Sequence, residues 1–472
     1  MSYYEVLSKT DMEQIHETSL SVMSKTGLDI QNDAARDLLS RGGARIDGTR
    51  VFFPTDMVTS AVQFAPERFC LHAPNPENSV EIGGDSSVFL PANCAAFVSD
   101  PDSGRRYGTL ADYENLVRLT AQSRYLDMSS SVLVEPSDIP PEQRNMRMLH
   151  TTFRNSDKCF MGGATGAKAA RETLDMVSIL FGISQSNLPD KARVISIPCS
   201  LTPLKYDRSM LDCLMTYAAA GQPVIVNSLG VSGTTAPGTL AGTLVVENAE
   251  ILAGITIAQL VREGTPVVYG GASTIANMRT GAVCVGAPEM ALNNAMTAQM
   301  ARFYKLPSRG CGTLTEAHEP DCQSAYESMM NLTTAVTSGL NMVLHAAGSL
   351  SSINCMSFEK FIIDEEMCGM AKRIKTGVNV DAETMGLGVI DQVGPGGHFL
   401  TSPHTFQHFR SEFFMPDISE RTGYDSAAEQ DIVSRANRKW KERLDRFQPP
   451  QLDPDIHRDL SRYVEGRVKC LS

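Results

Sequence analysis

The sequence predicts an α/β chain built on a (β/α)8 TIM barrel, with an N-terminal cap and a C-terminal helical extension. The first observation is a unit that occurs twice between Val224 and Ser273, in which a short β-branched run ends in polar or glycine residues and a helical run follows. This order is typical of a βα unit in a parallel sheet. The second observation is that eight such runs recur at intervals of roughly 30 to 45 residues, which is the number of strands that closes a barrel.

The eight predicted strands set the domain boundaries. They end, in order, near Pro91, Val132, Gly163, Ser200, Ser228, Gly271, Gly312 and Ala346. We therefore assign residues 85–375 to the barrel, residues 1–84 to the cap and residues 376–472 to an extension packed on the barrel. An open, doubly wound sheet alternates strands and helices in the same way, but the number of repeats favours the barrel. In barrel enzymes the chemistry lies on the loops that follow the strands.

Both flanking segments contain helical signals. In the cap, Ser8 and Asp11 can begin a helix, and the run DAARDLLSRGG predicts a second helix that ends at Gly42 and Gly43. The segment RVFFPTDMVTSAVQFAP then predicts a strand, a turn and a helix. In the extension, a charged helix is predicted up to Leu444, followed by a short helix over DIHRDLSRYVEGR.

The composition excludes several classes of partner. The chain has 472 residues, 42% of them hydrophobic, and a formal net charge of −12. An acidic chain without a long Lys/Arg run is not expected to bind nucleic acid or an anionic membrane. No run approaches the about 18 apolar residues of a membrane span, and the N-terminus lacks the order of a signal peptide, so we expect a cytoplasmic location. The eleven cysteines include no CxxC pair, which favours reduced thiols.

The common cofactor motifs are absent from the sequence. No GxGxxG opens a helix after a strand and no GxxxxGK[ST] is present, so nucleotide cofactors receive no support. His398, His404 and His408 invite a metal interpretation, but no HExxH surrounds them and they follow the barrel, so no protein-bound metal is expected. Cys311 and His345 end neighbouring strands and could form a nucleophile pair. The sequence leaves that contact open.

Long stretches of the chain carry a family resemblance. They include GLNMVLHAAGSLSSINCMSFEKFIIDEEMCGM, VIDQVGPGGHFLTSPHTFQHFRSEFF, ANRKWKERLDRFQPPQLDP and, in the N-terminal half, FVSDPDSGRRYGTLADYENLVRLT. These stretches closely resemble the trimethylamine methyltransferase superfamily of corrinoid-dependent methyltransferases, over nearly the whole chain. The resemblance implies a barrel enzyme that moves a methyl group from a methylamine-type substrate to cobalt in a separate corrinoid protein.

One departure from the superfamily bears on the substrate. The archaeal trimethylamine enzymes carry a pyrrolysine in the loop after the penultimate strand, which the pattern places within Cys311–Thr315, and this chain has ordinary residues there. Where relatives often have Asp-Ala-Lys, it has Glu316, Ala317 and His318. Members without pyrrolysine resemble enzymes for quaternary amines. The resemblance therefore implies glycine betaine as the methyl donor and dimethylglycine as the product, with proline betaine, carnitine and γ-butyrobetaine as alternative donors.

A quaternary ammonium substrate changes what the barrel must do. Its leaving group is already a neutral tertiary amine and cobalt(I) is a strong nucleophile, so no general acid is needed and the protein has to position the substrate and exclude water. We expect aromatic faces and one carboxylate around the cation, since a desolvated cation–π contact contributes about 2 kcal/mol or more. A betaine carboxylate needs hydrogen-bond donors. The substrate-binding candidates are Phe97, Tyr269 and Phe358 for the cation and Asn93, Asn227 and Arg309 at strand ends, with Glu316 and His345 as electrostatic or positioning groups.

These candidates have simpler structural explanations. Phe97 and Phe358 can be core residues, and Arg309 can pair with a nearby acid. Glycines at strand ends would let the flat corrinoid ring approach closely, although glycine there is also ordinary turn chemistry. The glycines concerned are Gly162, Gly163, Gly270, Gly271 and Gly312. The corrinoid (cobalamin) itself is expected on a partner protein, because the chain has no Asp-x-His-x-x-Gly pattern.

Two other classes of function compete with methyl transfer. A barrel lyase or decarboxylase would need a lysine at a strand end, and none of the eight predicted ends has one. A non-catalytic binder of quaternary amines would hold the ligand without transferring its methyl group. The Ala/Gly-rich helix NAEILAGITIAQLV can pack against another barrel helix or against a second subunit, and a homo-oligomer is expected.

Overall fold

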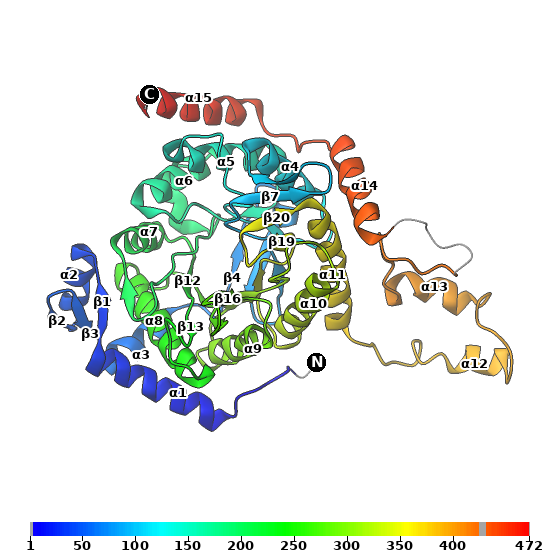
Figure 1. Ribbon diagram of the computed structural model, residues 1–472, viewed down its shortest axis with the longest axis horizontal. Helices are drawn as coiled ribbons and strands as arrows, with labels where there is room; N and C mark the ends of the chain where they lie inside the picture. Colours follow the sequence, from blue (N-terminus) through cyan, green and yellow to red (C-terminus); the bar gives the residue numbers. More distant parts are fainter. Residues whose placement is uncertain (1–2, 424–430, 472) are drawn as a thin grey trace.

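The computed structural model describes residues 3–423 and 431–471. Helices surround a central group of strands, with the N-terminal segment along one side of this ring and the last helix along another (Figure 1). The chain therefore has a mixed α/β fold in which strands and helices alternate.

The short strands at the centre of the ring pair in parallel. One sheet has the order β12 (Val224–Ser228), β14 (Val267–Gly271), β17 (Ser308–Cys311), β18 (Met342–Leu344) and β6 (Val88–Phe89). A second parallel pair consists of β9 (Met128–Ser129) and β10 (Cys159–Phe160). Each of these strands coincides with a strand predicted from the sequence.

The remaining predicted strand, at residues 194–200, is present only as isolated bridges. Ile195 bridges Met161, which follows β10, and Ser196 bridges Val224 of β12. Pro198 interrupts this run, and proline has no N–H group for a sheet hydrogen bond. The segment therefore lies between β10 and β12 without forming a regular strand.

A pair of hydrogen bonds joins β6 to the residue before β9. The Asp127 N–H donates to the Phe89 carbonyl at 2.9 Å, and the Asp127 carboxylate accepts from the Phe89 N–H at 2.8 Å. In the part of the chain that the structure describes, the central strands thus form a five-stranded and a two-stranded sheet, and no continuous eight-stranded ladder is present.

Helices follow the central strands and pack on their outer side. They are α4 (Leu110–Gln122), α5 (Pro141–Asn155), α6 (Gly166–Leu180), α7 (Arg208–Ala219), α8 (Leu240–Val261), α9 (Pro288–Phe303), α10 (Cys322–Thr337) and α11 (Phe358–Thr376). Each packs against the next along the chain. The short helices η2 (Pro76–Asn78) and η3 (Gln185–Asp190) lie in loops. This arrangement leaves the two ends of the central strands to loops, hairpins and short 3-10 helices.

Alternation along the strands divides the core into two layers. In β12, Ile225 points inside the strands, while Val224 and Val226 point toward the helices. In β14, Val268 points inside and Tyr269 points toward the helices. Successive side chains of a strand lie on opposite faces. Tyr269 is therefore a residue of the helix layer.

Residues 3–64 cover one side of the ring. α1 (Lys9–Ser21) begins at the predicted start, where Ser8 and Asp11 form a capping box and bind each other's backbone. The following elements are η1 (Val22–Thr26), β1 (Leu28–Ile30), α2 (Asp33–Arg41), β2 (Arg45–Asp47), β3 (Arg50–Phe52) and α3 (Thr55–Phe64). β1 also pairs in parallel with β11 (Lys205–Tyr206). The N-terminal segment and the central part of the chain therefore share a sheet.

A hairpin fills the N-terminal end of the central strands. It consists of β4 (Arg68–Leu71) and β5 (Val80–Gly83). Leu71 bridges Ala192, and both Leu71 and Ile82 belong to the hydrophobic cluster inside the strands. The thiol of Cys159, at the start of β10, donates to the Leu71 carbonyl at 3.2 Å. The opening at this end is therefore plugged by apolar side chains.

α8 is the most apolar long helix. By length and composition it could cross a membrane, but 78% of the relevant window is buried inside the structure. It packs against α1, α3 and α7 and against β12 and β14. Its stretch NAEILAGITIAQLV therefore finds its partners within the same chain.

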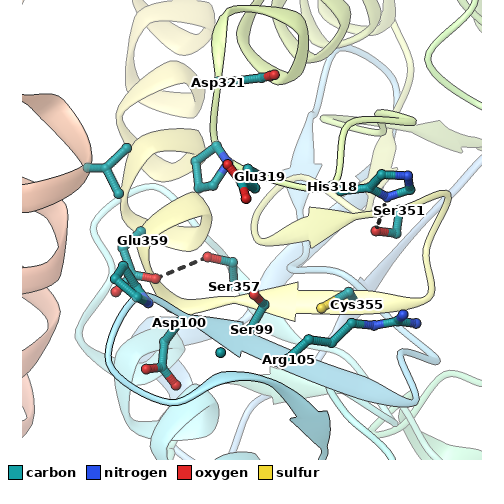
Figure 2. A pocket seen from close by; sticks show the side chains of 14 residues that line it. Ser99, Asp100, Arg105, His318, Glu319, Asp321, Ser351, Cys355, Ser357 and Glu359 are labelled. Carbon is teal, nitrogen blue, oxygen red and sulfur yellow. Dashed lines mark hydrogen bonds between the residues drawn. The ribbon is translucent and has the colours of Figure 1, made fainter.

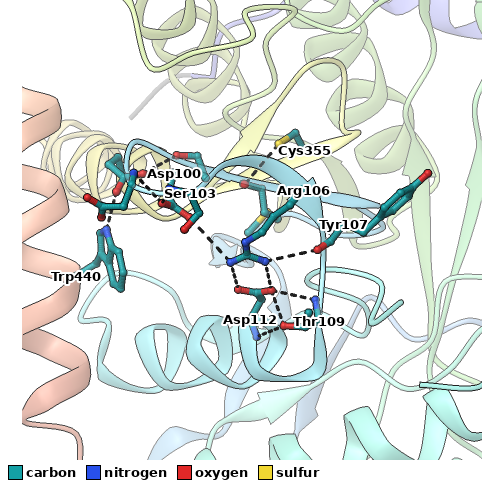
Figure 3. Close-up of polar contacts among 12 residues, drawn as sticks. Asp100, Ser103, Arg106, Tyr107, Thr109, Asp112, Cys355 and Trp440 are labelled. Atoms are coloured by element: carbon teal, nitrogen blue, oxygen red, sulfur yellow. Dashed lines mark hydrogen bonds and ion pairs between the residues drawn. The ribbon is translucent and has the colours of Figure 1, made fainter. Parts of the chain in front are cut away.

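Loops at the C-terminal ends of the strands form two small sheets. One has the order β19 (Ser349–Leu350), β20 (Cys355–Ser357), β7 (Phe97–Asp100) and β8 (Gly104–Tyr107), and the other has the order β13 (Val231–Ser232), β15 (Thr274–Ala276) and β16 (Val283–Cys284). The guanidinium of Arg106 in β8 donates twice to Asp112 of α4, at 2.6 and 2.7 Å (Figure 3). This bidentate contact fastens the β7–β8 hairpin to the ring.

The C-terminal extension has a packed part and a projecting part. α14 (Ile432–Asp445) contacts both α11 and α4. The Trp440 ring stacks on Phe358 at 4.8 Å, and its indole N–H donates to Glu359 at 2.6 Å. α15 (Pro454–Leu471) packs on α5 and α6. By contrast, α12 (Leu387–Val393) and α13 (Pro403–Glu412) project away from the ring (Figure 1).

Candidate active site

Polar residues from four different strand ends come together at the C-terminal end of the central strands. Asn93 follows β6, Asn227 lies in β12, Arg309 lies in β17 and His345 follows β18. Arg309 Nη1 donates to Asn227 Oδ1 at 2.9 Å, and the Asn93 N–H donates to His345 Nδ1 at 3.3 Å. The charge of Arg309 also lowers the pKa of His345, so the two pairs are neighbours. All four residues were predicted from the sequence as substrate-binding or positioning candidates.

Arg309 is a buried cation without a carboxylate beside it. The residue is 2% exposed, and its Nε has no hydrogen-bond partner. Within residues 3–423 and 431–471, no acid lies within ion-pair distance of its guanidinium, so the simpler explanation of a nearby acid finds no support. A buried charge costs free energy unless it is paired. The guanidinium therefore has no counter-charge among the described residues.

His345 is buried and neutral. Burial, followed by the charge of Arg309, lowers its pKa to about 3. Because Nδ1 accepts the Asn93 N–H, the neutral ring carries its proton on Nε2. The backbone of His345 has a left-handed φ of 59°, and the Thr313 N–H donates to its carbonyl at 2.8 Å. The ring thus supplies an N–H donor near the guanidinium.

The two asparagines are held by hydrogen bonds that occupy their amide oxygens. Asn93 Oδ1 accepts from the Val132 N–H at 2.8 Å, and Asn227 Oδ1 accepts from Arg309. The Asn227 Nδ2 donates to the Cys199 sulfur at 3.4 Å, which is a weak acceptor. The polar groups of this cluster are therefore mainly donors, which is the chemistry that a carboxylate requires.

Glu316 lies on another part of the same face. Its Oε1 accepts the Gly286 N–H at 2.7 Å. Burial, with a contribution from the charge of Glu327, raises its pKa. Glu327 in turn accepts the Glu316 N–H at 3.0 Å. The structure therefore ties Glu316 to the loop before α9 and does not bring it to Arg309.

The three rings predicted to surround an ammonium group lie apart. Tyr269 faces the helix layer, where its hydroxyl donates to Asn248 at 3.0 Å. Phe358 is covered by the Trp440 ring of α14. Phe97 stays on the C-terminal side, but the Arg105 guanidinium lies 3.9 Å from its ring centroid and covers that face. These residues therefore do not assemble into one aromatic cage.

The glycines predicted to face a corrinoid ring lie against the chain's own atoms. A Cβ on Gly162 would lie 2.4 Å from the Tyr217 hydroxyl oxygen, and one on Gly271 would lie 2.0 Å from the Thr297 hydroxyl oxygen. A Cβ on Gly163, Gly270 or Gly312 would meet Asn145 at 2.2 Å, Ile225 at 2.9 Å or Ala346 at 2.8 Å. Glycine at these positions allows strands, helices and loops to pack closely, and it leaves no open cradle for a flat ring.

A pocket of about 640 Å³ opens on the same face. It lies between the β7–β8 hairpin, β20 and the loop from His318 to Asp321 (Figure 2). These segments follow β6, β18 and β17, the strands that also position Asn93, His345 and Arg309. Its carboxylates are Asp100, Glu319, Asp321 and Glu359, against the single guanidinium of Arg105. The pocket is therefore acidic and suits a cation.

The described residues at this face do not favour a thiol nucleophile at Cys311 and contain no arranged metal centre. Burial raises the pKa of Cys311, which keeps its thiol protonated. His404 and His408 lie together in the projecting α13, with ring centroids 4.4 Å apart. Within the described residues, no group of three or more His, Cys, Asp or Glu side chains is arranged to hold a metal ion.

The whole chain matches a known family. The family model described as trimethylamine methyltransferase (MTTB) covers residues 1–471. The chain belongs to the trimethylamine methyltransferase family. It is 42% identical to a glycine betaine methyltransferase of Desulfitobacterium hafniense (strain Y51), over 99% of this chain and 98% of the relative.

More distant relatives carry other substrates in their names. The chain is 31% identical to the trimethylamine methyltransferase MttB of Desulfitobacterium hafniense (strain DSM 10664 / DCB-2), over 97% of this chain and 93% of the relative. It is 28% identical to the L-carnitine:corrinoid methyltransferase of Eubacterium limosum, over 94% and 93%. The family resemblance read from the sequence is thus confirmed.

One solved structure has a similar fold. The chain aligns with the crystal structure of the Methanosarcina barkeri monomethylamine methyltransferase (MtmB) at a TM-score of 0.50 and 12% identity, over 96% of both chains. At this identity the similarity concerns the fold alone.

Two buried carboxylates of this family member support the strand ends and were missed by the sequence analysis. Glu247 of α8 accepts the Ser273 N–H at 3.0 Å. Glu250, one turn later, accepts from the Ser228 hydroxyl at 2.7 Å and from the Leu204 N–H at 2.6 Å. Carboxylates in an apolar helix must find polar partners. Two glutamates three residues apart in the run VVENAEILAG were the signal that could have identified them.

Glu247→Gln is expected to flatten the pH dependence of stability. Burial raises the pKa of Glu247 to about 7, from an ordinary value of 4.5. Between these values the folded protein holds a proton that the unfolded chain releases, so the wild type loses about 3 kcal/mol of unfolding free energy as the pH rises through this window. The variant lacks this titration. Urea unfolding at several pH values measures the difference, with the exposed Glu263→Gln as control, and parallel profiles would contradict the assignment.

Proposed function

We propose that this protein moves a methyl group from glycine betaine to cobalt(I) of a corrinoid carried by a partner protein, leaving dimethylglycine. The observation that carries the proposal is the buried guanidinium of Arg309, which has donors around it and no carboxylate of its own. Glycine betaine supplies the missing carboxylate and carries a permanent cation at its other end. The relative with 42% identity is named for the same substrate, which supports the proposal.

The chain's own residues position the substrate in this proposal. Arg309 and the Nε2–H of His345 donate to the substrate carboxylate, and Asn227 and Asn93 hold these two side chains in place. The ammonium end points toward the acidic pocket, where Glu319 and its neighbours favour a cation. The corrinoid supplies the nucleophile for the methyl group. The carbon–nitrogen bond breaks with its electron pair left on nitrogen, so the chain transfers no proton and needs no metal of its own.

We also propose that the central strands close into the (β/α)8 barrel expected from the sequence. The neighbour relations support closure, because they run from β6 through β9, β10, residues 195–196, β12, β14, β17 and β18 and return to β6. The barrel then comprises residues 85–375, the cap residues 1–84 and the extension residues 376–472. A cytoplasmic location without nucleic-acid or membrane partners is part of the same proposal.

Other quaternary amines are the main alternative substrates. Proline betaine, carnitine and γ-butyrobetaine all carry a carboxylate that Arg309 could bind, and two relatives are named for carnitine and proline betaine. A lyase receives less support, because the buried lysines Lys158 and Lys360 lie before β10 and in α11, away from the strand ends.

The visible spectrum of free cob(I)alamin tests the proposed reaction. Loss of the cobalt(I) band, with one dimethylglycine formed per methylcobalamin, is expected when protein and glycine betaine are both present. Carnitine, proline betaine, γ-butyrobetaine, trimethylamine and the carboxylate-free choline are compared under the same conditions. A reaction with trimethylamine alone would contradict the proposal. Calorimetric binding of glycine betaine without any spectral change would identify a non-catalytic binder.

A further inference from the structure

The segment from residue 378 to residue 415, called the arm below, exposes many apolar side chains. Ten large apolar residues of the arm are exposed, against nine in the rest of the described chain. Leu387, Leu400 and Phe406 are exposed to 68%, 83% and 72%. Neither α12 nor α13 contains a buried residue. Soluble monomers rarely expose large contiguous apolar surface, and a partner that covered the arm would remove these side chains from water.

The arm is held in a defined position despite lacking a core. Arg373 near the end of α11 joins the two sides of the arm: Nη1 donates at 2.7 Å to the carbonyl of Gly377, the residue just before the arm, and Nε donates at 2.8 Å to the carbonyl of Glu412 within the arm. Within the arm, Glu383 accepts from Gln407 at 3.1 Å and ties the segment before α12 to α13. These hydrogen bonds fix the backbone of the arm, so its apolar side chains are exposed in defined positions.

We propose that the arm is an interface between two copies of this chain, whose arms pack against each other about a two-fold axis. Its ten apolar side chains together expose on the order of 1,000 Å², compared with about 800 Å² that each partner contributes to a stable interface of standard size. A two-fold contact uses the same patch on both copies. A single surface on each chain is therefore sufficient.

A second copy fits this surface better than the corrinoid protein does. In the proposed reaction the corrinoid protein has to bind and leave in every cycle, and interfaces of this transient kind are smaller and more polar than permanent ones. The arm also projects sideways from the ring, whereas the hairpins at the strand ends lie over its centre (Figure 1). A dimer joined through the arms leaves that face free.

Sedimentation velocity of the full chain tests the proposal. The wild type is expected to sediment as a dimer at about 10 µM, and the double variant Leu400→Asp/Phe406→Asp as a monomer, because buried unpaired carboxylates oppose association. The control is Met278→Asp, which replaces another apolar residue, 76% exposed, outside the arm. It is expected to remain a dimer. Since all three side chains are exposed in the single chain, the variants should fold, which circular dichroism verifies.

Three results would overturn the inference. They are a monomeric wild type at this concentration, a double variant that remains dimeric, and an arm whose amide hydrogens become protected from exchange only when the corrinoid protein is added. None of these measurements depends on methyl transfer. The proposed function and the proposed interface can therefore fail separately.

Discussion

Replacing Arg309 with methionine is expected to weaken glycine betaine binding about 100-fold, which corresponds to about 2.7 kcal/mol. Among the residues that the structure describes, the guanidinium has Asn227 as a partner and no carboxylate, so in the proposed complex the substrate carboxylate is its counter-charge. Removing the guanidinium leaves the substrate carboxylate unpaired in a buried site. Titration calorimetry measures the loss of affinity, and the cob(I)alamin reaction measures the matching rise in KM.

The same substitution is expected to leave the melting temperature unchanged or higher. An uncompensated buried charge destabilises the folded state, and methionine removes that charge at similar length. Arg193→Met is the matched control, because Arg193 is also buried but donates to backbone carbonyls, including that of Lys191 at 3.1 Å. The control should lower the melting temperature without changing KM. Unchanged affinity in Arg309→Met, or a large loss of stability, would contradict the assigned role.

Replacing Lys360 with methionine is expected to lower the unfolding free energy by about 3–5 kcal/mol, because it leaves the buried Asp364 carboxylate without its cation. Both side chains are 0% exposed and form an ion pair. Asp364 also accepts from the Thr313 hydroxyl at 2.8 Å and from the Gly348 N–H at 2.9 Å. The ion pair therefore joins the loop that follows β17 to the loop that follows β18. Arg309 lies in β17, and His345 is the first residue after β18.

Urea unfolding at neutral pH measures this effect. The double variant Lys360→Met/Asp364→Asn is expected to recover part of the loss, because no uncompensated charge remains and the amide can still accept from Thr313. Lys372→Met serves as a control, since Lys372 pairs with Asp127 in a half-exposed position and should cost much less. A loss below about 1 kcal/mol in Lys360→Met would show that the ion pair is not important for stability.

Much of the strand arrangement could be predicted because its signal is local. The runs around Val224 and Val267 are β-branched, short and followed by helices, and this local pattern is typical of buried parallel strands. The same reasoning placed Asn227 and Arg309 at strand ends on a common face. Their hydrogen bond spans 82 residues, and parallel pairing through β14 brings the two residues together.

The other site predictions depended on which way a side chain points and on which distant residues it contacts, and a local sequence pattern contains neither. The alternation in β14 indicates that Val268 and Tyr269 face opposite ways, but not which of them faces inside, so Tyr269 was selected for a cation site and lies under the helices. Phe358 is covered by Trp440 from a distant helix, and no periodicity indicates that contact. The carboxylates of α8 act through residues that follow distant strands, such as Ser228 and Ser273, and the sequence pattern of the helix does not contain those partners.

The β4–β5 hairpin has a consequence for the order of events during turnover. Leu71 and Ile82 fill the N-terminal end of the central strands, so in the proposed reaction glycine betaine and the corrinoid protein both approach from the C-terminal end. In that proposal glycine betaine binds before the corrinoid protein covers the C-terminal end, and dimethylglycine leaves after the corrinoid protein has dissociated. The closed N-terminal end therefore favours an ordered kinetic mechanism, in which substrate binding precedes binding of the corrinoid protein.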